Sequence, residues 1–492
     1  MRRGLLLAAL AGVLAGRGCG FGPTDSFTGR RIGDGVAPYT DHGEVRICAG
    51  NDRLGSPTSM AGGFCDRPIP GAPCDADADC RSRERCVCGV CTVQFCSSSA
   101  ECGFGRVCSF VDNRCDRPCA SRADCATGES CINQVCRSGP CSADSQCQTG
   151  ERCGTATPRR CVVDPCESDS ACTMFPGRTS CKIQRRPRAA REPTVLLDPG
   201  ARRPFLMFLA LDEPSGTTAI YRADSDDGVS FTLDPADRAV LLPVAGDLGK
   251  ADAPSVVRDG ATLVMYFESA GASIARATSM DGGRSWSRSP AVNDGRVLSA
   301  SGGWEGGRVG APAAALSGSG ATLLFYEGGA GAGVGLAVAP PGSSSFARSG
   351  DGRVLAPAAA ADPVLWRGVD AVASPFADVR PGARAGTDQV RVWFAARGME
   401  SAAAKKLGVL TPIPANFSIG FASSTFDGAK LGTLVPHPWN PVFDRIEGFL
   451  VHPSELSPAV IEVPEGERYL LYYGRAREDG SAYANLGVAE NP

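Results

Sequence analysis

Short apolar runs separated by turn residues fill the C-terminal part of the chain. The clearest example is the stretch 252–286, where turns at 259–260, 269–272 and 281–283 separate three short strands and the start of a fourth. The second of these strands, LVMYFE (263–268), is rich in β-branched and aromatic residues, which favour strands. Four antiparallel strands of this length are typical of one blade of a β-propeller.

The same pattern occurs five times, with a second strand at 205–210, 263–268, 323–328, 390–395 and 469–474. The openings of the first strands align at Pro193, Pro254, Pro312, Val372 and Pro458, about 60 residues apart except for the last step. An insertion at roughly 397–417 explains that longer step. One such repeat cannot bury its apolar faces alone, but five repeats can do so by stacking radially. The pattern therefore predicts an all-β fold, a five-bladed β-propeller over 192–492.

The fifth repeat ends just after its third strand, at Asn491-Pro492. Because an open strand edge invites aggregation, proteins usually cover it. We therefore expect an N-terminal segment to supply the missing outer strand, and the basic linker 182–191 is one candidate. Since the core comes from the five repeats, a chain that starts near Lys182 is expected to fold alone.

The N-terminus has the pattern of an export signal. Arg2 and Arg3 precede a ten-residue apolar stretch, 5–14, which is too short to span a bilayer. Cys19 follows and resembles the lipid-attachment cysteine of bacterial lipoproteins. We predict that 1–19 is a signal peptide, with lipidation and simple secretion as alternatives. The stretch 20–47 lacks periodicity and is expected to be a flexible tether.

Residues 48–181 hold all of the cysteines but Cys19, out of 23 in the chain. Units of about 22 residues repeat a spacing of three cysteines with five residues between neighbours, as in Cys119, Cys125 and Cys131. An even cysteine number in an exported chain favours a disulfide-rich, loop-dominated repeat region over a zinc site at the Cys-x-x-Cys of 88–91. The pairing stays open. The spacing resembles Dickkopf-type and EGF-like cysteine-rich modules.

Charge and motifs exclude several functions. The chain has 50 Lys and Arg against 53 Asp and Glu, a net charge of −3, which gives no reason to expect nucleic-acid binding. It has no nucleophile elbow and no P-loop, and its glycine-rich 328–335 lies in a predicted hairpin. We expect no cofactor and no metal ion.

The propeller topology brings one set of residues to one face, which we call the top. First strands start there, and the loops that lead into them lie there too. The residues expected at this face are Glu192, Asp252, Asp370 and Glu455 at strand openings, and Trp304, Glu305, Arg308, Trp366, Arg367, Trp439 and His452 on loops. Acids, arginines and aromatic rings suit a sugar ligand. The alternative is that the tryptophans pack between blades and the acids are solvated.

The repeats resemble five-bladed glycoside hydrolases of the arabinanase, β-xylosidase and invertase type, on the motifs DAPSV (252–256), VMYF (264–267) and the strand-to-turn pattern that ends at Trp286. This resemblance implies a base or nucleophile at Glu192 and an orienting carboxyl at Asp252. Gly310 occupies the third position, so Glu305 is the substitute acid, with its pKa expected to be raised by Trp304.

One further motif, Ser279 to Trp286, matches the Asp-box of sialidases. It falls on a turn of the opposite face, and a weaker copy occurs at 225–231. We expect Asp281 to cap turn amides and Trp286 to pack between blades, with no part in a ligand site.

These observations predict a secreted or outer-envelope protein, attached to a membrane only if Cys19 is lipidated. Its propeller is expected to recognise a glycan or cell-surface polysaccharide, and whether it also hydrolyses a glycosidic bond stays open. The alternative is a non-catalytic adhesion or protein-binding module that acts through the propeller face and the cysteine-rich repeats.

Overall fold

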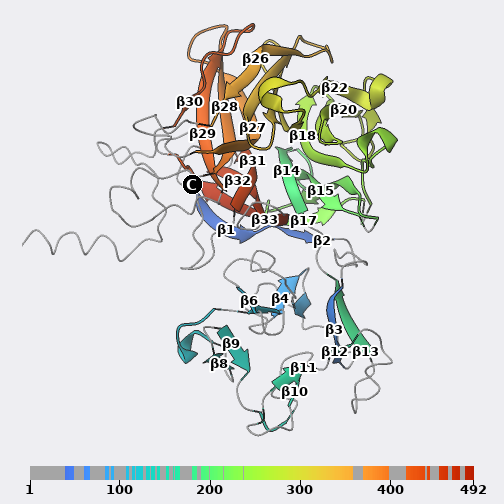
Figure 1. Ribbon diagram of the computed structural model, residues 1–492, viewed down its shortest axis with the longest axis vertical. Coiled ribbons are helices and arrows are strands. Elements are labelled where there is room, and N and C mark those ends of the chain that lie inside the picture. Colours follow the sequence, from blue (N-terminus) through green and yellow to red (C-terminus); the bar gives the residue numbers. More distant parts are fainter. Residues whose placement is uncertain are drawn as a thin grey trace, which may run out of the picture.

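The computed structural model describes residues 39–48, 60–66, short segments between 84 and 185, and 190–491 with gaps at 199, 214, 236–237, 358–368, 398–416, 438–439, 444–453, 464–467 and 477–482. The regular secondary structure of the described part is almost entirely strand (Figure 1). Among these residues, no helix is long and apolar enough to cross a membrane.

Five antiparallel sheets form the blades of a β-propeller, as the repeats predict (Figure 1). Blade one consists of β14 (Ala190–Leu197), β15 (Phe205–Asp212), β16 (Thr218–Ser225) and β17 (Ser230–Leu233). Blade two consists of β18 (Ala251–Asp259), β19 (Thr262–Ser269), β20 (Ser273–Ser279) and β21 (Ser287–Arg288), and β22 (Arg296–Ser299) also pairs with β20. Blade three consists of β23 (Val309–Leu316), β24 (Thr322–Gly328), β25 (Gly333–Ala339) and β26 (Ala347–Leu355). Blade four consists of β27 (Ala371–Pro381), β28 (Asp388–Arg397), β29 (Phe417–Phe426) and β30 (Val435–Pro436). Blade five consists of β31 (Ser454–Val463), β32 (Arg468–Ala476) and β33 (Tyr483–Asn491).

The missing outer strand of blade five comes from β1 (Thr40–Glu44), which pairs antiparallel with β33. After Val45 the chain continues as β2 (Arg46–Cys48), which runs parallel to β17 at the outer edge of blade one. We call residues 39–48 the strap, because they join the last blade to the first. The strap lies mostly within 20–47, the stretch expected to be a tether. That stretch therefore contributes strands to the propeller, and the linker 182–191 does not close it.

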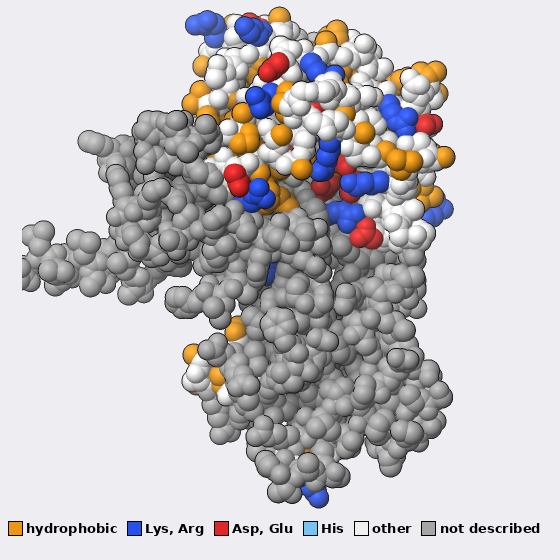
Figure 2. All heavy atoms as spheres, in the orientation of Figure 1, with side chains coloured by type: hydrophobic (Ala, Val, Ile, Leu, Met, Phe, Trp, Pro, Cys, Tyr) orange, Lys and Arg blue, Asp and Glu red, His pale blue; other side chains and the backbone are white. Residues whose placement is uncertain are grey.

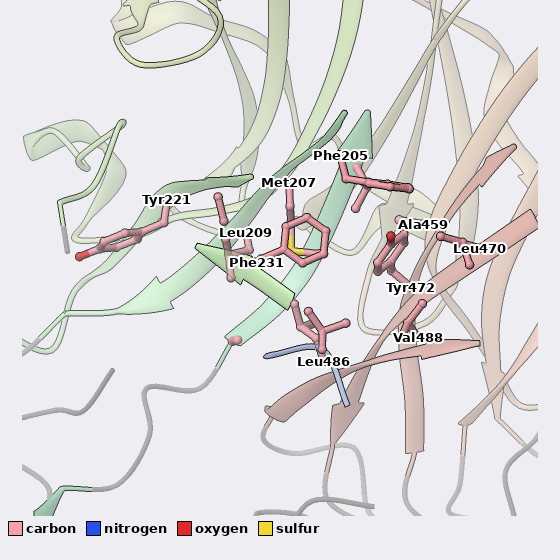
Figure 3. Packing of buried hydrophobic residues seen from close by; sticks show 14 of the residues in the cluster. Phe205, Met207, Leu209, Tyr221, Phe231, Ala459, Leu470, Tyr472, Leu486 and Val488 are labelled. Atoms are coloured by element: carbon pink, nitrogen blue, oxygen red, sulfur yellow. The ribbon is translucent and has the colours of Figure 1, made fainter. Parts of the chain in front are cut away.

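Side chains fix the strap at two places. Tyr39 is buried in an aromatic cluster with Trp393, Tyr469 and Tyr473, which belong to blades four and five. Val45 is buried in the largest core cluster, where residues of blade one such as Phe231 meet residues of blade five such as Tyr472 (Figure 3). The strap thus stabilises the ring of blades on both sides of its closing point.

Each innermost strand has an irregularity at the same place. Pairing skips two residues there, and the first of the two has a positive φ while the second is proline. The prolines are Pro193, Pro254, Pro312, Pro375 and Pro458. The sequence alignment of the fourth repeat at Val372 was therefore wrong by three residues. The fourth first strand is the longest of the five, and its bulge begins at the fourth residue of the strand, one residue later than in blades one to three.

The cysteine-rich region consists of small hairpins. They are β4 (Glu84–Val87) with β5 (Val90–Val93), β6 (Val107–Ser109) with β7 (Arg114–Asp116), β8 (Glu129–Ile132) with β9 (Val135–Ser138), and β10 (Glu151–Cys153) with β11 (Cys161–Val163); β3 (Met60–Asp66) pairs with β12 (Pro165–Cys166) and β13 (Ser180–Arg185). Three disulfides are described, Cys119–Cys131, Cys125–Cys136 and Cys141–Cys153. Disulfide bonding is thus confirmed for these cysteines.

A metal-like grouping in this region is explained by the same bonds. The sulfur atoms of Cys119, Cys125 and Cys136 lie within 4.8 Å of one another. All three belong to disulfides, so none offers the thiolate that a zinc ion requires.

The pairing gives a prediction for peptide mapping under non-reducing conditions. Cys131 and Cys136 lie directly opposite each other on β8 and β9, yet each bonds to a cysteine nearer the N-terminus. We expect mass spectrometry to recover peptides joined as Cys119–Cys131 and Cys125–Cys136. A peptide with a Cys131–Cys136 bridge, free thiols or bound zinc would contradict this prediction.

Candidate functional site at the mouth of the channel

The first residues of the five bulges surround the central channel. They are Glu192, Ala253, Ala311, Ser374 and Ser457, with φ between 40° and 51°, and we call them the ring. With their prolines they line a cavity of about 30 Å³, which holds about two water molecules and no sugar ring. A larger ligand would therefore have to bind outside this cavity. We call the charged side chains around the ring the mouth; they are Arg191, Lys250, Asp252, Glu268 and Arg308.

Three carboxylates accept hydrogen bonds from backbone N–H groups of the ring. Asp252 accepts from Ala253 (2.9 Å), Glu268 from Ala311 (3.3 Å), and Glu327 from Ser374 (3.2 Å). All three carboxylates are buried. They therefore provide hydrogen-bond acceptors for the N–H groups of residues whose positive φ is rare outside glycine.

Sequence reasoning missed Glu268 and Glu327. Each is an acidic residue near the end of an otherwise apolar second strand, in LVMYFE and LLFYEG, and that pattern is the signal that could have found them. A charged residue in a buried strand needs a partner, so its presence indicates a polar contact that the sequence does not name.

Gly310 shows how one blade completes the next. A Cβ atom at Gly310 would lie 2.1 Å from the carboxylate oxygen Oε2 of Glu268, because Glu268 reaches across from blade two. The third blade therefore needs no acid of its own at this position. Its place is occupied by a carboxylate from the neighbouring blade.

We expect Gly310→Ala to displace the Glu268 carboxylate and weaken its hydrogen bond to Ala311. Overpacking of a buried site costs about 1–3 kcal/mol of unfolding free energy. Gly302→Ala is the matched control, because nothing lies within 4 Å of its Cβ position. Urea denaturation of the two variants measures the difference, and equal midpoints would contradict the proposed contact.

Alternating charges connect the first three blades. Arg191 pairs with Asp212 (2.6 Å) and Asp252 (3.2 Å), and Lys250 pairs with Glu268 (2.6 Å). Lys250 also lies 3.6 Å from Asp252, and Arg308 lies 3.9 Å from Glu268. Asp252 and Glu268 are opposite partners in the sheet, where two like charges repel each other. Lys250 offsets this repulsion.

Exposure differs between the partners of these ion pairs. The side chains of Lys250 and Arg308 are 38% and 41% exposed, while those of Asp252 and Glu268 are 4% and 2% exposed. The pair of Arg191 and Asp212 is the reverse, at 14% and 47%. At blades two and three a ligand would therefore meet the nitrogen donors first. Acidic and basic side chains are interspersed over the propeller face seen in Figure 2.

Glu192 is the one acid that belongs to the ring itself. Its side chain is partly buried, and its Oε2 atom is inaccessible to solvent. Burial raises its pKa well above the usual range, and the negative charges of Asp252 and Glu268 raise the pKa further, against the opposing effect of Arg191 and Lys250. Burial likewise raises the pKa of Glu327.

The protonation state of Glu305 differs from the expectation. Its carboxylate accepts hydrogen bonds from Arg348 (2.7 Å), Tyr326 (2.8 Å) and the backbone and hydroxyl of Ser301. Burial alone would raise its pKa, but these hydrogen bonds lower the pKa to about 2. The expectation of a raised pKa was wrong, and a carboxylate held in this way does not donate a proton near neutral pH.

Trp304 packs into the protein and does not form an open sugar platform. Its ring stacks on Tyr326 at 5.9 Å, its indole N–H donates to the carbonyl oxygen of Asp351 (3.0 Å), and Arg353 lies over its ring. A Cβ atom at Gly328 would lie 2.2 Å from the Trp304 ring. These contacts favour the structural alternative for this residue.

The remaining predicted residues are only partly described. Asp370 pairs with Arg397 (2.8 Å) at the top of blade four and is 57% exposed. The backbone of Glu455 pairs with Arg475 in blade five. Cys19, Trp366, Arg367, Trp439 and His452 lie outside the described residues.

The Asp-box turn has the structural role that we expected. Asp281 accepts hydrogen bonds from the backbone N–H groups of Arg284 and Ser285 (both 3.0 Å), and the hydrogen bond from the Ser285 hydroxyl is the main cause of its lowered pKa. Trp286 packs edge-on against Phe208 of blade one at 5.5 Å. Asp227 caps the equivalent turn in blade one.

No protein-family model and no curated protein matches the chain. Solved structures with a similar fold include a glycosyl hydrolase from Bacteroides ovatus, at 15% identity over 62% of this chain and 84% of that one, with a TM-score of 0.42. Another comes from the GH130 family of mannoside phosphorylases, which contains glycoside hydrolases that target β-1,2-mannosidic linkages in Candida mannan, at 15% identity over 62% and 85%, with a TM-score of 0.42.

An exo-1,5-α-L-arabinanase from a bovine ruminal metagenomic library matches at 14% identity over 61% of this chain and 92% of that one, with a TM-score of 0.38. The propeller thus has glycoside hydrolases among its structural neighbours. Identity and superposition at these levels are too low to transfer an activity to this chain.

Proposed function

We propose that the mouth of the propeller binds carbohydrate. The observation that carries this proposal is the position of the half-exposed cations Lys250 and Arg308 beside the buried carboxylates of Asp252 and Glu268. Sugar hydroxyl groups both donate and accept hydrogen bonds, so they match a surface that offers both kinds of group. Lys250 and Arg308 come directly before the inner strands β18 and β23, whose pairing fixes the backbone beside them. Fixing these groups before a ligand binds lowers the entropic cost of binding.

Binding of the purified full-length protein to a glycan array tests the proposal. We expect a restricted set of glycans to bind, and Arg308→Ala to weaken that binding. Asp281→Asn, on the opposite face, is the control and should bind as the wild type does. An array without any bound glycan, or equal loss in both variants, would count against a carbohydrate site at the mouth.

Hydrolysis of a glycosidic bond is a second candidate. It needs two carboxyls with different protonation states near one bond. Glu192, with its raised pKa, and the ion-paired Asp252 belong to neighbouring blades of the same mouth. Release of nitrophenol from a panel of aryl glycosides by the wild type, and its loss in Asp252→Asn, would support it. No turnover on glycans that do bind would leave the mouth a binding site.

The proposal places the protein outside the cytoplasm. The disulfides that the structure describes support an oxidising compartment, and the N-terminal sequence supports export. Cell fractionation of wild type and Cys19→Ser separates the two alternatives. Release of the variant from the membrane fraction would support a lipid anchor, and identical soluble localisation would support simple secretion.

A further inference from the structure

The ring has one position that departs from the other four. Blades two to five place Ala253, Ala311, Ser374 and Ser457 there, and blade one places Glu192. Its φ of 51° lies in a region that non-glycine residues rarely adopt. A long acidic side chain in this strained place, where the other four blades have alanine or serine, points to a role that alanine or serine cannot fill.

The charges around Glu192 are already engaged with one another. The charges that act on its carboxyl group are those of the anions Asp252 and Glu268 and the cations Arg191 and Lys250. Arg191 contacts Asp252, Asp212 and Thr218, while Lys250 contacts Glu268 and Asp252. A negative charge on Glu192 would raise the number of carboxylates in this group to four, with Asp212, Asp252 and Glu268, against two cations. One oxygen of Glu192 is also inaccessible to solvent, and the residue lines the cavity. Such a site favours the neutral form of the carboxyl.

We propose that Glu192 is held in the folded protein as a neutral carboxylic acid and donates a hydrogen bond from its hydroxyl group to the ligand. Glu192, Lys250 and Arg308 then all offer hydrogen-bond donors to a ligand beside the ring. The ligand atom that fits this set is an oxygen that accepts and does not donate, such as a ring, glycosidic or carboxylate oxygen of a saccharide. The part of this inference that concerns the ligand rests on the proposed carbohydrate function, whereas the protonation state does not.

The protonation state has a consequence for stability that needs no ligand. An unfolded glutamate has a pKa of about 4.3. Between this pH and the higher pKa of the folded protein, the folded state binds one proton more than the unfolded state. Stability therefore falls as the pH rises through this window, and the unfolding equilibrium constant grows by up to about tenfold for each pH unit through Glu192 alone.

Urea denaturation of the full chain between pH 4 and pH 8 tests this directly. Relative to wild type, Glu192→Gln should gain stability steadily as the pH rises through the window, because glutamine keeps the shape and carries no charge. Glu192→Ser, which installs the residue of two other ring positions, should show the same pH trend even if its absolute stability differs. The control is Glu462→Gln, at an acid that is 48% exposed and pairs with Arg380. Parallel pH profiles for wild type and both ring variants would overturn the proposal.

A second measurement addresses the ligand. For a glycan found on the array, Glu192→Gln should bind within about threefold of the wild type, because its amide N–H still donates. Glu192→Ser should lose about tenfold or more in affinity. Wild-type affinity should fall at high pH while that of Glu192→Gln stays level. If no glycan binds, the carbohydrate function fails and the stability profiles still decide the protonation state; if a glycan binds all three proteins equally at every pH, the donor role is wrong.

Discussion

A chain that begins at Ala49 should not show cooperative thermal unfolding, whereas a chain that begins at Tyr39 should unfold like the full-length protein. Removal of the strap takes away the outer strand of blade five and the parallel strand of blade one. It also removes Tyr39 and Val45 from two buried clusters. Loss of one buried aromatic costs about 3–5 kcal/mol, and a domain is stabilised by about 5–15 kcal/mol in total.

Circular dichroism during heating measures this effect, with the single substitution Cys48→Ser as the control for the cysteine that truncation also removes. A chain starting near Lys182 should fail for the same reason, which reverses the expectation from the repeats alone. If the chain that begins at Ala49 melts at the wild-type temperature, the strap is not part of the folded core.

Asp247→Ala should destabilise the propeller by about 3–5 kcal/mol, because it leaves a largely buried arginine without its carboxylate. Asp247 is fully buried in η5 (Ala245–Asp247), pairs with Arg288, and accepts hydrogen bonds from the Ser269 hydroxyl (2.5 Å) and the Val244 N–H (2.9 Å). These contacts hold the loop that leads into Lys250 and β18. The same change should therefore disturb the mouth as well as stability.

Asp294→Ala is the matched control for this prediction. Asp294 is 47% exposed and lies at 4.0 Å from Arg296, a pair that contributes little. We expect its urea midpoint to stay close to that of the wild type. A loss of less than about 1 kcal/mol in Asp247→Ala would show that Arg288 finds other acceptors, such as the carbonyl oxygen of Asp294.

The repeating strands could be predicted because each blade carries its own apolar pattern. The Asp-box turn was predictable for a similar reason, since Asp281 caps backbone groups only three and four residues away. Local patterns of this kind need no knowledge of distant contacts. The fourth repeat was aligned at Val372 instead of Pro375, because the bulges that set the true alignment, with a positive φ at Ser374, leave no mark on hydrophobic periodicity.

The mouth was harder to predict because its contacts join residues of different blades. Glu268 fills the space at Gly310 and caps Ala311, and neither contact is visible along the sequence. The pKa of Glu305 was wrongly predicted for the same reason. Its neighbour Trp304 suggested a raised pKa, but Arg348, more than forty residues away in the chain, decides its charge.

The most direct test of a carbohydrate site at the mouth is calorimetric titration of one glycan, chosen on the array, into wild type, Arg308→Ala, Glu192→Ser and Asp281→Asn. We expect an affinity at least about tenfold lower for Arg308→Ala and Glu192→Ser, both of which alter the mouth. Asp281→Asn should bind with wild-type affinity, because Asp281 caps a turn on the opposite face. Unchanged affinity in both mouth variants, together with a loss in Asp281→Asn, would show that the glycan binds on the other face and not at the mouth.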